Sequence, residues 1–241
     1  MPAAARMTQT PLLAGLAPPS VIVAEAFGDV DASLLPAERA HIAGASSRRR
    51  AEFTTVRHLA GRALAELGLE RPAMVPGPMG EPAWPDGVVG SLTHCRGYRA
   101  AAVARTSQVA ALGIDAEPNR SLAGGVLARI ASPAERENVR ELVEALPDVA
   151  GDRLLFSIKE SVYKAWFPLA HRPLRFGEAA VTIRSDGTFT ARLAAGADDD
   201  ADGAGPTGRW AAAGGLLASA VVVLVDIDGF RSVSPIKSRQ H

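Results

Sequence analysis

Cysteine and net charge are scarce in this chain of 241 residues, and long apolar runs are missing. The single cysteine cannot form an internal disulfide, which is typical of a reducing compartment. Lysine plus arginine and aspartate plus glutamate both number 26, so the overall charge favours neither nucleic acid nor an anionic membrane. The longest apolar run, at 214–225, is too short to cross a bilayer. We therefore expect a cytoplasmic protein that binds neither nucleic acid nor membrane.

The first half of the chain alternates strand and helix patterns. Its length and its hydrophobic share of 47% are sufficient for one sizeable domain or for two small lobes. Residues before position 21 form a loose segment, and residues 36–67 form one helical pattern that Gly68 ends. Strand patterns occur at 21–27, 88–94, 100–105 and 109–117.

The second half repeats this organisation. Ser132, with Pro133 and Glu135 after it, has the spacing of a capping box at a helix start, and residues 152–166 have a second helical pattern. Asp186 and Gly187 predict a hairpin, residues 196–208 a loop, and two strands end the pattern. We expect two α+β lobes, 1–112 and 113–241, that meet near residues 107–113.

Thr93, His94 and Cys95 place a hydroxyl, an imidazole and the only thiol side by side. Adjacent residues of a strand point to opposite faces, so His94 is badly placed to deprotonate Cys95. Cys95 is then a small buried thiol, and Thr93 an ordinary strand residue. His94 is either a hydrogen-bonded core histidine or part of a site.

Asp115 and Glu117 end a predicted strand in the stretch GIDAEP. Side chains at i and i+2 share a face, so the two carboxylates project together, about 7 Å apart along the strand. Buried like charges at that distance favour a cation between them, and oxygen ligands suit Mg²⁺ or Mn²⁺. The alternative is an exposed strand end with two solvated acids.

Glu160 and Lys164 share one face of the helix predicted from LLFSIKESVYKAW. Such a pair is often only a surface ion pair. Here the surrounding helix is unusually apolar, and a buried carboxylate requires a partner or a metal. Arginines 48, 49, 50 and 57 form a basic cluster that either is a solvated helix face or binds phosphate, with Arg49 and Arg57 near one face.

Three acids, a lysine and an arginine cluster suit displacement at a diphosphate. The stretches GSLTHCRGYRAAAVA, GIDAEP and FSIKESVYK, together with the arginine cluster, resemble the surfactin-type phosphopantetheinyl transferases. They are most similar to the subgroup around enterobactin synthase component D and its actinobacterial relatives. The resemblance extends from about residue 48 to about residue 176.

The resemblance implies two α+β lobes related by a pseudo-twofold axis, with coenzyme A in the cleft between them. It implies transfer of 4′-phosphopantetheine to a serine of an apo acyl or peptidyl carrier protein, with release of adenosine 3′,5′-bisphosphate. The internal pseudo-twofold makes a monomer the expected state.

Residue roles follow from the same resemblance. Asp115, Glu117 and Glu160 would hold Mg²⁺. Glu160, directly or through a metal-bound water, would be the base, and Lys164 would contact the transferred phosphate. The residues expected to bind the nucleotide end of coenzyme A are Arg49, Arg57, Thr93 and His94, with Lys159 nearby.

Two positions depart from the family pattern. Met79 stands where this subgroup usually has a basic residue, and Ala116 stands where other branches have a third acid. Met79 supports one alternative, a homologue that binds coenzyme A or a carrier protein without turnover. A second alternative is an unrelated Mg²⁺-dependent nucleotide phosphohydrolase that acts without a carrier.

Overall fold

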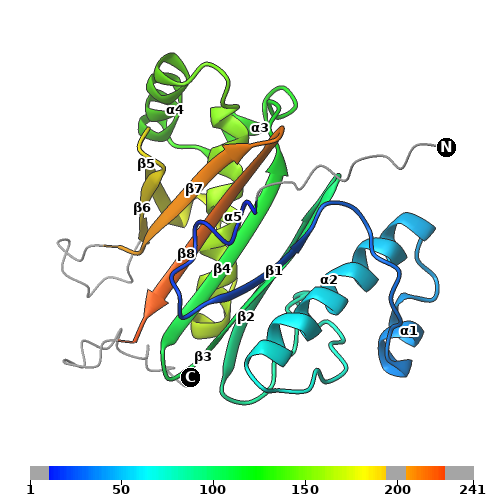
Figure 1. Ribbon diagram of the computed structural model, residues 1–241. Coiled ribbons are helices and arrows are strands. Elements are labelled where there is room, and N and C mark those ends of the chain that lie inside the picture. The colour runs from blue at the N-terminus through cyan, green and yellow to red at the C-terminus, as the bar shows by residue number, and fades with distance from the viewer. Residues whose placement is uncertain (1–10, 194–204, 226–241) are drawn as a thin grey trace, which may run out of the picture.

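The computed structural model describes residues 11–193 and 205–225, so most of the loop predicted at 196–208 lies outside the described residues. The first lobe contains β1 (Ile22–Ala26), α1 (Pro36–Ile42), α2 (Ser47–Glu66), β2 (Val88–Cys95) and β3 (Tyr98–Arg105). The second contains β4 (Val109–Pro118), α3 (Val126–Ile130), α4 (Pro133–Ala145), α5 (Gly151–Ala170), the 3₁₀ turn η1 (Phe176–Glu178), β5 (Ala179–Ile183), β6 (Thr188–Leu193), β7 (Thr207–Ala213) and β8 (Leu216–Leu224). Helices and antiparallel sheets in both lobes confirm the predicted α+β class (Figure 1).

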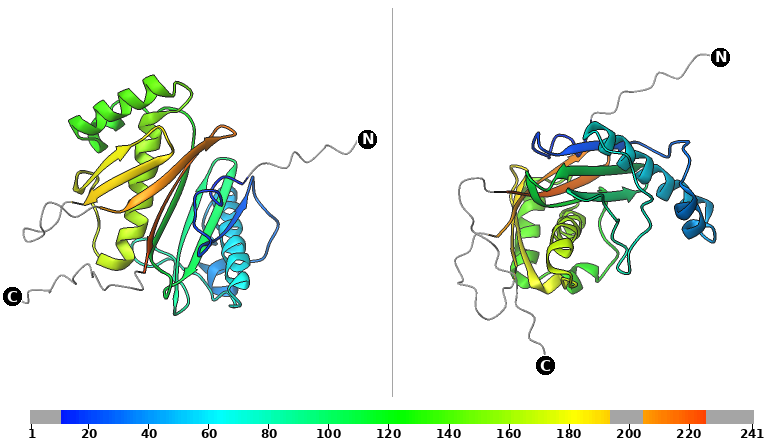
Figure 2. Two further views of the ribbon diagram at one scale, coloured as in Figure 1. Left: turned by 60° about the vertical axis from the view of Figure 1, so that its left-hand side comes forward. Right: turned by 90° about the horizontal axis from the view of Figure 1, so that it is seen from below.

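Two separate sheets carry the two lobes. The first has the strand order β1-β3-β2, and the second has the order β4-β8-β7-β6-β5. The predicted division at 112/113 falls inside β4, a strand that belongs wholly to the second sheet. Because β2 and β4 are both edge strands, the lobes meet where these two edges face each other (Figure 2).

Helix α2 covers one face of the first sheet. The Ser46 side chain accepts a hydrogen bond from the Arg49 amide and caps this helix. The prediction of one continuous helix over 36–67 is wrong, because residues 43–46 separate α1 from α2. Apolar residues of α2 pack on the sheet in a core that includes Leu59, Ala60, Ala63, Leu64, Ala101 and Val103.

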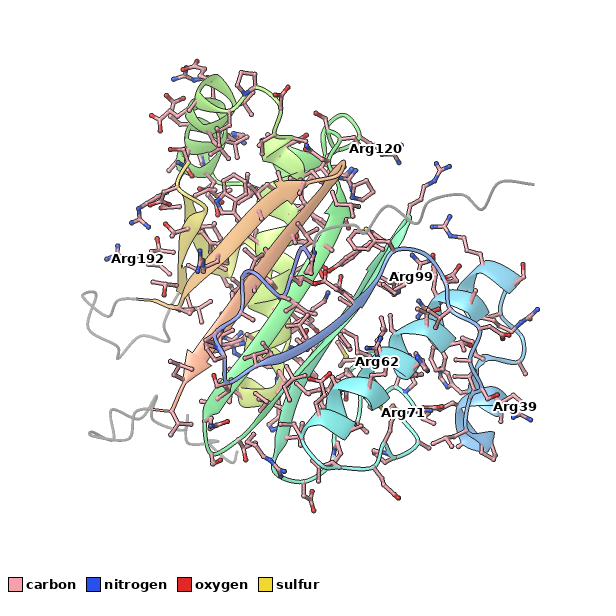
Figure 3. All side chains as sticks on the ribbon, in the orientation of Figure 1. Arg39, Arg62, Arg71, Arg99, Arg120 and Arg192 are labelled. Atoms are coloured by element: carbon pink, nitrogen blue, oxygen red, sulfur yellow. The ribbon has the colours of Figure 1, made fainter. Side chains whose placement is uncertain are left out.

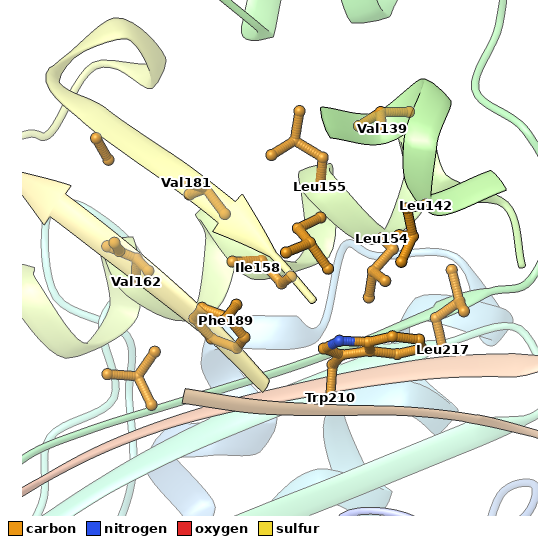
Figure 4. Packing of buried hydrophobic residues seen from close by; sticks show 14 of the residues in the cluster. Val139, Leu142, Leu154, Leu155, Ile158, Val162, Val181, Phe189, Trp210 and Leu217 are labelled. Carbon is orange, nitrogen blue, oxygen red and sulfur yellow. The ribbon is translucent and has the colours of Figure 1, made fainter. Parts of the chain in front are cut away.

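Helix α5 is the central element of the second lobe. It lies behind β4 and β8 in Figure 1, and Figure 4 shows its apolar face packed against Phe189, Trp210 and Leu217. The capping box predicted at Ser132 is confirmed at the start of α4, and the predicted hairpin joins β5 to β6. Gly187 has a φ of 85°, which a residue without a side chain adopts easily.

The expectation that the segment before residue 21 is loose is wrong for its described part. Leu12 and Leu13 are buried in a third core on the face of the second sheet opposite α5. The Glu25 carboxylate on β1 accepts hydrogen bonds from the amides of Leu12 (2.9 Å), Leu13 (3.2 Å) and Ala14 (3.3 Å). Charged acceptors make strong hydrogen bonds, so this segment is fixed across both lobes.

Candidate active site

A cleft of about 520 Å³ lies between the lobes and brings most of the predicted site residues together. Helix α2 and the loop at 76–84 form one side, β2 forms the floor, and α5 forms the other side. The predicted residues that line it are Arg49, Arg57, Thr93, His94, Asp115, Glu160 and Lys164. A cleft with apolar walls and a few converging charges is the common form of a small-molecule site.

Gly113 permits α5 to approach β4 closely. A Cβ atom at this position would lie 1.9 Å from the Ser161 carbonyl oxygen and 2.7 Å from the Ala165 nitrogen. No side chain other than hydrogen fits there, so the backbone of α5 lies directly on the strand. This contact brings the helix residue Lys164 to the strand residue Asp115.

Asp115 is the most enclosed acid of the site. Its Oδ1 atom lies 2.7 Å from Lys164 Nζ and accepts a 3.3 Å hydrogen bond from the Thr93 hydroxyl. Its Oδ2 atom is buried and has no hydrogen-bond partner among the described residues. A buried carboxylate oxygen without a partner is costly, and such an atom is suited to a ligand or a cation.

Glu117 and Glu160 are half-buried acids whose pKa values are raised. Burial is the larger cause for both, and the Asp115 charge raises both pKa values further. Glu117 is held by Arg153, whose Nη1 atom lies 3.0 Å from Glu117 Oε2. Glu160, by contrast, makes no hydrogen bond or ion pair within the described part of the chain.

The three acids fit a divalent cation by chemistry but do not converge on one point. Among the described residues, no group of three His, Cys, Asp or Glu side chains is arranged to hold a metal ion. Asp115 is paired with Lys164 and Glu117 with Arg153. Oxygen donors, an unpartnered buried Oδ2 and mutual repulsion between carboxylates nevertheless suit Mg²⁺ or Mn²⁺.

Arg49 and His94 meet on the first-lobe side of the cleft. Arg49 Nη1 lies 2.7 Å from His94 Nε2, so that nitrogen accepts the bond and the imidazole is neutral. Burial lowers the pKa of His94, and the Arg49 charge lowers it further. Glu52 lies on the other side of the ring, with Oε2 3.9 Å from His94 Nδ1. His94 is therefore a site residue and not a core histidine.

Arg99 supports this group from beneath. It extends from β3 toward α2 (Figure 3) and lies 2.8 Å from Asp29 and 3.7 Å from Glu52. Burial acts to raise the pKa of Glu52, but hydrogen bonding from Arg48 and the charges of His94, Arg48 and Arg99 together lower it. Glu52 thus stays ionised and connects the cleft to a buried arginine.

Arg57 is buried at the base of the cleft and positioned by neutral groups. Its guanidinium stacks on the Phe53 ring, with Cζ 3.1 Å from the ring centroid, and its Nε donates a 3.0 Å bond to the Met74 carbonyl. Burial lowers its pKa to about 10. Met74 is in turn fixed by Glu38 of α1, which accepts its amide at 2.9 Å and contacts Arg71. Arg57 remains cationic at neutral pH and is available to an anion.

Lys159 is the predicted site residue that the structure does not bring into the cleft. Its ammonium lies 2.8 Å from Glu135 Oε1 and donates to the carbonyls of Phe176 (2.7 Å) and Ala179 (2.9 Å). Adjacent helix residues point about 100° apart, so Glu160 faces the cleft while Lys159 faces α4 and β5. The expectation that Lys159 binds coenzyme A is therefore corrected to a structural role.

Cys95 and Met79 stand as the sequence predicted. The Cys95 thiol is buried, and burial, with the Glu117 and Asp115 charges, raises its pKa to about 12, so it is no nucleophile. Met79 lines the cleft with 54% of its surface exposed and supplies no charge there.

Sequence reasoning missed Arg153, Tyr163 and Trp84. Arg153 precedes Glu160 by seven residues, two helical turns, and this spacing on one face is the signal that could have found it. Tyr163 and Trp84 line the cleft, and the Pro- and Gly-rich loop that carries Trp84 has no periodic signal.

Among helices of the described ranges, none combines the length and the hydropathy that crossing a bilayer requires.

Comparison with known families agrees with this geometry. Residues 37–104 match the family described as 4′-phosphopantetheinyl transferase N-terminal domain, and residues 111–212 match the 4′-phosphopantetheinyl transferase superfamily. The first match ends within β3 and the second begins within β4, which is where the two sheets separate.

Similar proteins carry the same name. The chain is 48% identical over 223 residues to the 4′-phosphopantetheinyl transferase Svp of Streptomyces mobaraensis, which covers 88% of this chain and 89% of the relative. It is 42% identical over 232 residues to PptT of Mycobacterium tuberculosis, covering 90% and 100%, respectively. It is 34% identical over 164 residues to enterobactin synthase component D of Salmonella typhimurium, covering 66% and 65%. With its two lobes, its cleft and its carboxylate–lysine cluster, the chain belongs to the 4′-phosphopantetheinyl transferase superfamily.

Proposed function

We propose that this enzyme transfers 4′-phosphopantetheine from coenzyme A to a serine of an apo acyl or peptidyl carrier protein. In this reaction the serine oxygen forms a bond to the β-phosphorus of coenzyme A. The bond from that phosphorus to the bridging oxygen breaks, and adenosine 3′,5′-bisphosphate leaves. The proposal includes the surfactin-type subgroup, the division into two lobes near β4, a monomeric state and a cytoplasmic location.

The observation that carries the proposal is the Glu160 carboxylate, which faces the cleft without a hydrogen bond or ion pair to any described residue. Burial keeps its pKa raised, so it binds a proton more readily than a solvated glutamate. Lys164 lies in the same cleft, one helical turn further along α5. A base and a cation on one helix face suit attack by a hydroxyl on a phosphate.

The chain supplies separate groups for separate parts of the reaction. Glu160 takes the proton of the attacking serine, and Lys164 stabilises charge on the transferred phosphate. Asp115, Glu117 and Glu160 would hold Mg²⁺. Bound there, the ion would supply neutralising charge to the diphosphate oxygens.

The first lobe would bind the nucleotide end of coenzyme A. Arg49 and Arg57 line the cleft on α2, eight residues apart, and both present cations to it. His94, neutral in the absence of ligand, gains a reason to protonate when a phosphate replaces the Arg49 contact. We place the 3′-phosphate near these three side chains because they are the basic groups that the first lobe presents to the cleft.

The test is intact-mass spectrometry of a panel of apo carrier proteins incubated with the enzyme, coenzyme A and Mg²⁺. We expect a phosphopantetheine mass gain that requires Mg²⁺ and is at least roughly 100-fold slower with Glu160→Gln. The matched control is Glu141→Gln, which neutralises an exposed acid on α4 outside the cleft and should leave the rate unchanged. No mass gain on any carrier, with coenzyme A still bound, would favour a non-catalytic binding protein. Release of adenosine 3′,5′-bisphosphate without a carrier would favour a phosphohydrolase.

A further inference from the structure

The edge strands β2 and β4 face each other without forming a backbone ladder in the described structure. Two hydroxyl groups of β2 take the place of that ladder. Ser91 Oγ accepts a 3.1 Å hydrogen bond from the Ile114 amide, and Thr93 Oγ1 accepts a 3.0 Å bond from the Ala116 amide. All four residues are buried, so these two amides depend on the hydroxyls for their hydrogen bonds.

The spacing of these contacts fixes the alignment of the strands. Ser91 and Thr93 are two residues apart, as are Ile114 and Ala116, so each hydroxyl meets one outward-pointing amide of the other edge. Asp115 lies between the two bonded amides, and His94 follows Thr93. A shift of the strands by one residue would move His94 relative to Asp115 by about 3.3 Å.

The Thr93 hydroxyl has already used its single proton. A carboxylate can only accept a hydrogen bond, so the 3.3 Å contact with Asp115 Oδ1 uses the hydroxyl proton. Phosphate oxygens also require donors. Thr93 therefore has no proton to offer the nucleotide while both contacts are in place.

We propose that Ser91 and Thr93 are positioning residues that fix the alignment of the two lobes, and that Thr93 is not a phosphate ligand. This inference rests on the proposed function, because the aligned parts are the nucleotide-binding side chains of the first lobe and the acids of the second. The two hydroxyls hold His94 and Asp115 at the separation that one coenzyme A molecule must span.

Three variants test the role of the hydroxyls. Thr93→Val keeps the shape and removes the acceptor, Thr93→Ser retains the hydroxyl, and Ser91→Ala removes a hydroxyl that does not contact Asp115. The matched control is Thr55→Val, since Thr55 is also buried and its hydroxyl accepts a backbone amide, that of Val30 at 3.1 Å, within the first lobe. The control accounts for the general loss of stability that comes with losing one such bond.

We expect kcat for carrier modification to fall at least tenfold in Thr93→Val and in Ser91→Ala. It should stay within twofold of wild type in Thr93→Ser and Thr55→Val. Affinity for adenosine 3′,5′-bisphosphate without metal, measured by calorimetry, should change less than twofold in all four. A tenfold loss of that affinity in Thr93→Val alone would overturn the proposal in favour of a phosphate ligand. An effect on kcat in Thr93→Val but not in Ser91→Ala would reduce the role to orienting Asp115 and would also overturn it.

A second readout does not depend on the reaction. Hydrogen exchange of the amides of Ile114 and Ala116 should accelerate at least tenfold in the corresponding hydroxyl variants, and not in Thr55→Val. If wild-type enzyme modified no carrier, the proposed function would fail while the exchange data still tested the alignment. Unchanged exchange in both variants would show that the hydroxyls do not hold the lobes.

Discussion

The Lys164 ammonium lies 2.7 Å from Asp115 Oδ1 and 3.1 Å from the carbonyl oxygen of Ile114. Arg153 pairs with Glu117 in the same way, at 3.0 Å. Two of the three acids expected to hold a metal thus each have a side-chain cation as partner. A divalent ion that binds Asp115 must compete with Lys164, and displacing Lys164 would free its ammonium for a phosphate.

Lys164→Gln should raise the affinity for Mn²⁺ in the absence of coenzyme A, by about three- to tenfold, because the competing cation is removed. Tenfold corresponds to about 1.4 kcal/mol. The measurement is Mn²⁺ titration followed by electron paramagnetic resonance. Arg49→Gln is the control, since it removes a cleft cation that does not contact Asp115. An equal gain in both variants would mean that net charge alone, and not exchange at Asp115, governs the affinity.

Glu160→Gln should raise the Tm of the metal-free protein at pH 8 by about 2–4 °C, or ~1 kcal/mol. Burial raises the pKa of Glu160, so the folded state holds this proton more tightly than the unfolded state does. Stability contributed by the protonated acid is lost as pH rises from its unfolded value through its folded pKa. The gain from the neutral amide should therefore shrink toward zero at pH 4. Differential scanning calorimetry in a chelator at both pH values measures this, and a gain that grows on acidification would contradict it.

Much of the site could be predicted because its residues are spaced by regular structure. Asp115 and Glu117 alternate on a strand, and Glu160 and Lys164 are one turn apart on a helix, so local periodicity places each pair on one face. The break between α1 and α2 was not predicted, because the apolar spacing continues through it. The burial of Leu12 and Leu13 was not predicted either, since it depends on Glu25, a distant partner that no local pattern indicates.

Gly113→Ala should destabilise the protein by about 1–3 kcal/mol or more, because the added methyl group would meet the backbone of α5 at Ser161 and Ala165. Helix α5 must move away from β4, and this separates Lys164 from Asp115. Urea unfolding measures the stability, and the mass-spectrometric assay measures the accompanying loss of transfer. Gly124→Ala is the control, since a Cβ there meets nothing within 4 Å. Wild-type stability in Gly113→Ala would mean that the close contact is not required.

Lys159 shows why a motif position does not by itself assign a role. The sequence places it beside Glu160, but its direction depends on α4 and β5, which supply Glu135 and the Ala179 carbonyl. Its side chain is 2% exposed and that of Glu135 is 4% exposed. The pair is therefore shielded from solvent, and each charge depends on the other.

Lys159→Met should lower the free energy of unfolding by about 3–5 kcal/mol, because it leaves the Glu135 carboxylate buried without its cation. Affinity for coenzyme A should stay within twofold, because Lys159 does not line the cleft, whereas Lys164→Gln should weaken it about tenfold. The double variant Glu135→Gln/Lys159→Met should recover at least half of the lost stability. The amide oxygen that Glu135→Gln introduces can still accept hydrogen bonds from the backbone amides of Ser132 and Val181, and it carries no charge. Urea unfolding and calorimetric binding measure the two effects separately. A tenfold loss of coenzyme A affinity in the folded double variant would return Lys159 to the binding site.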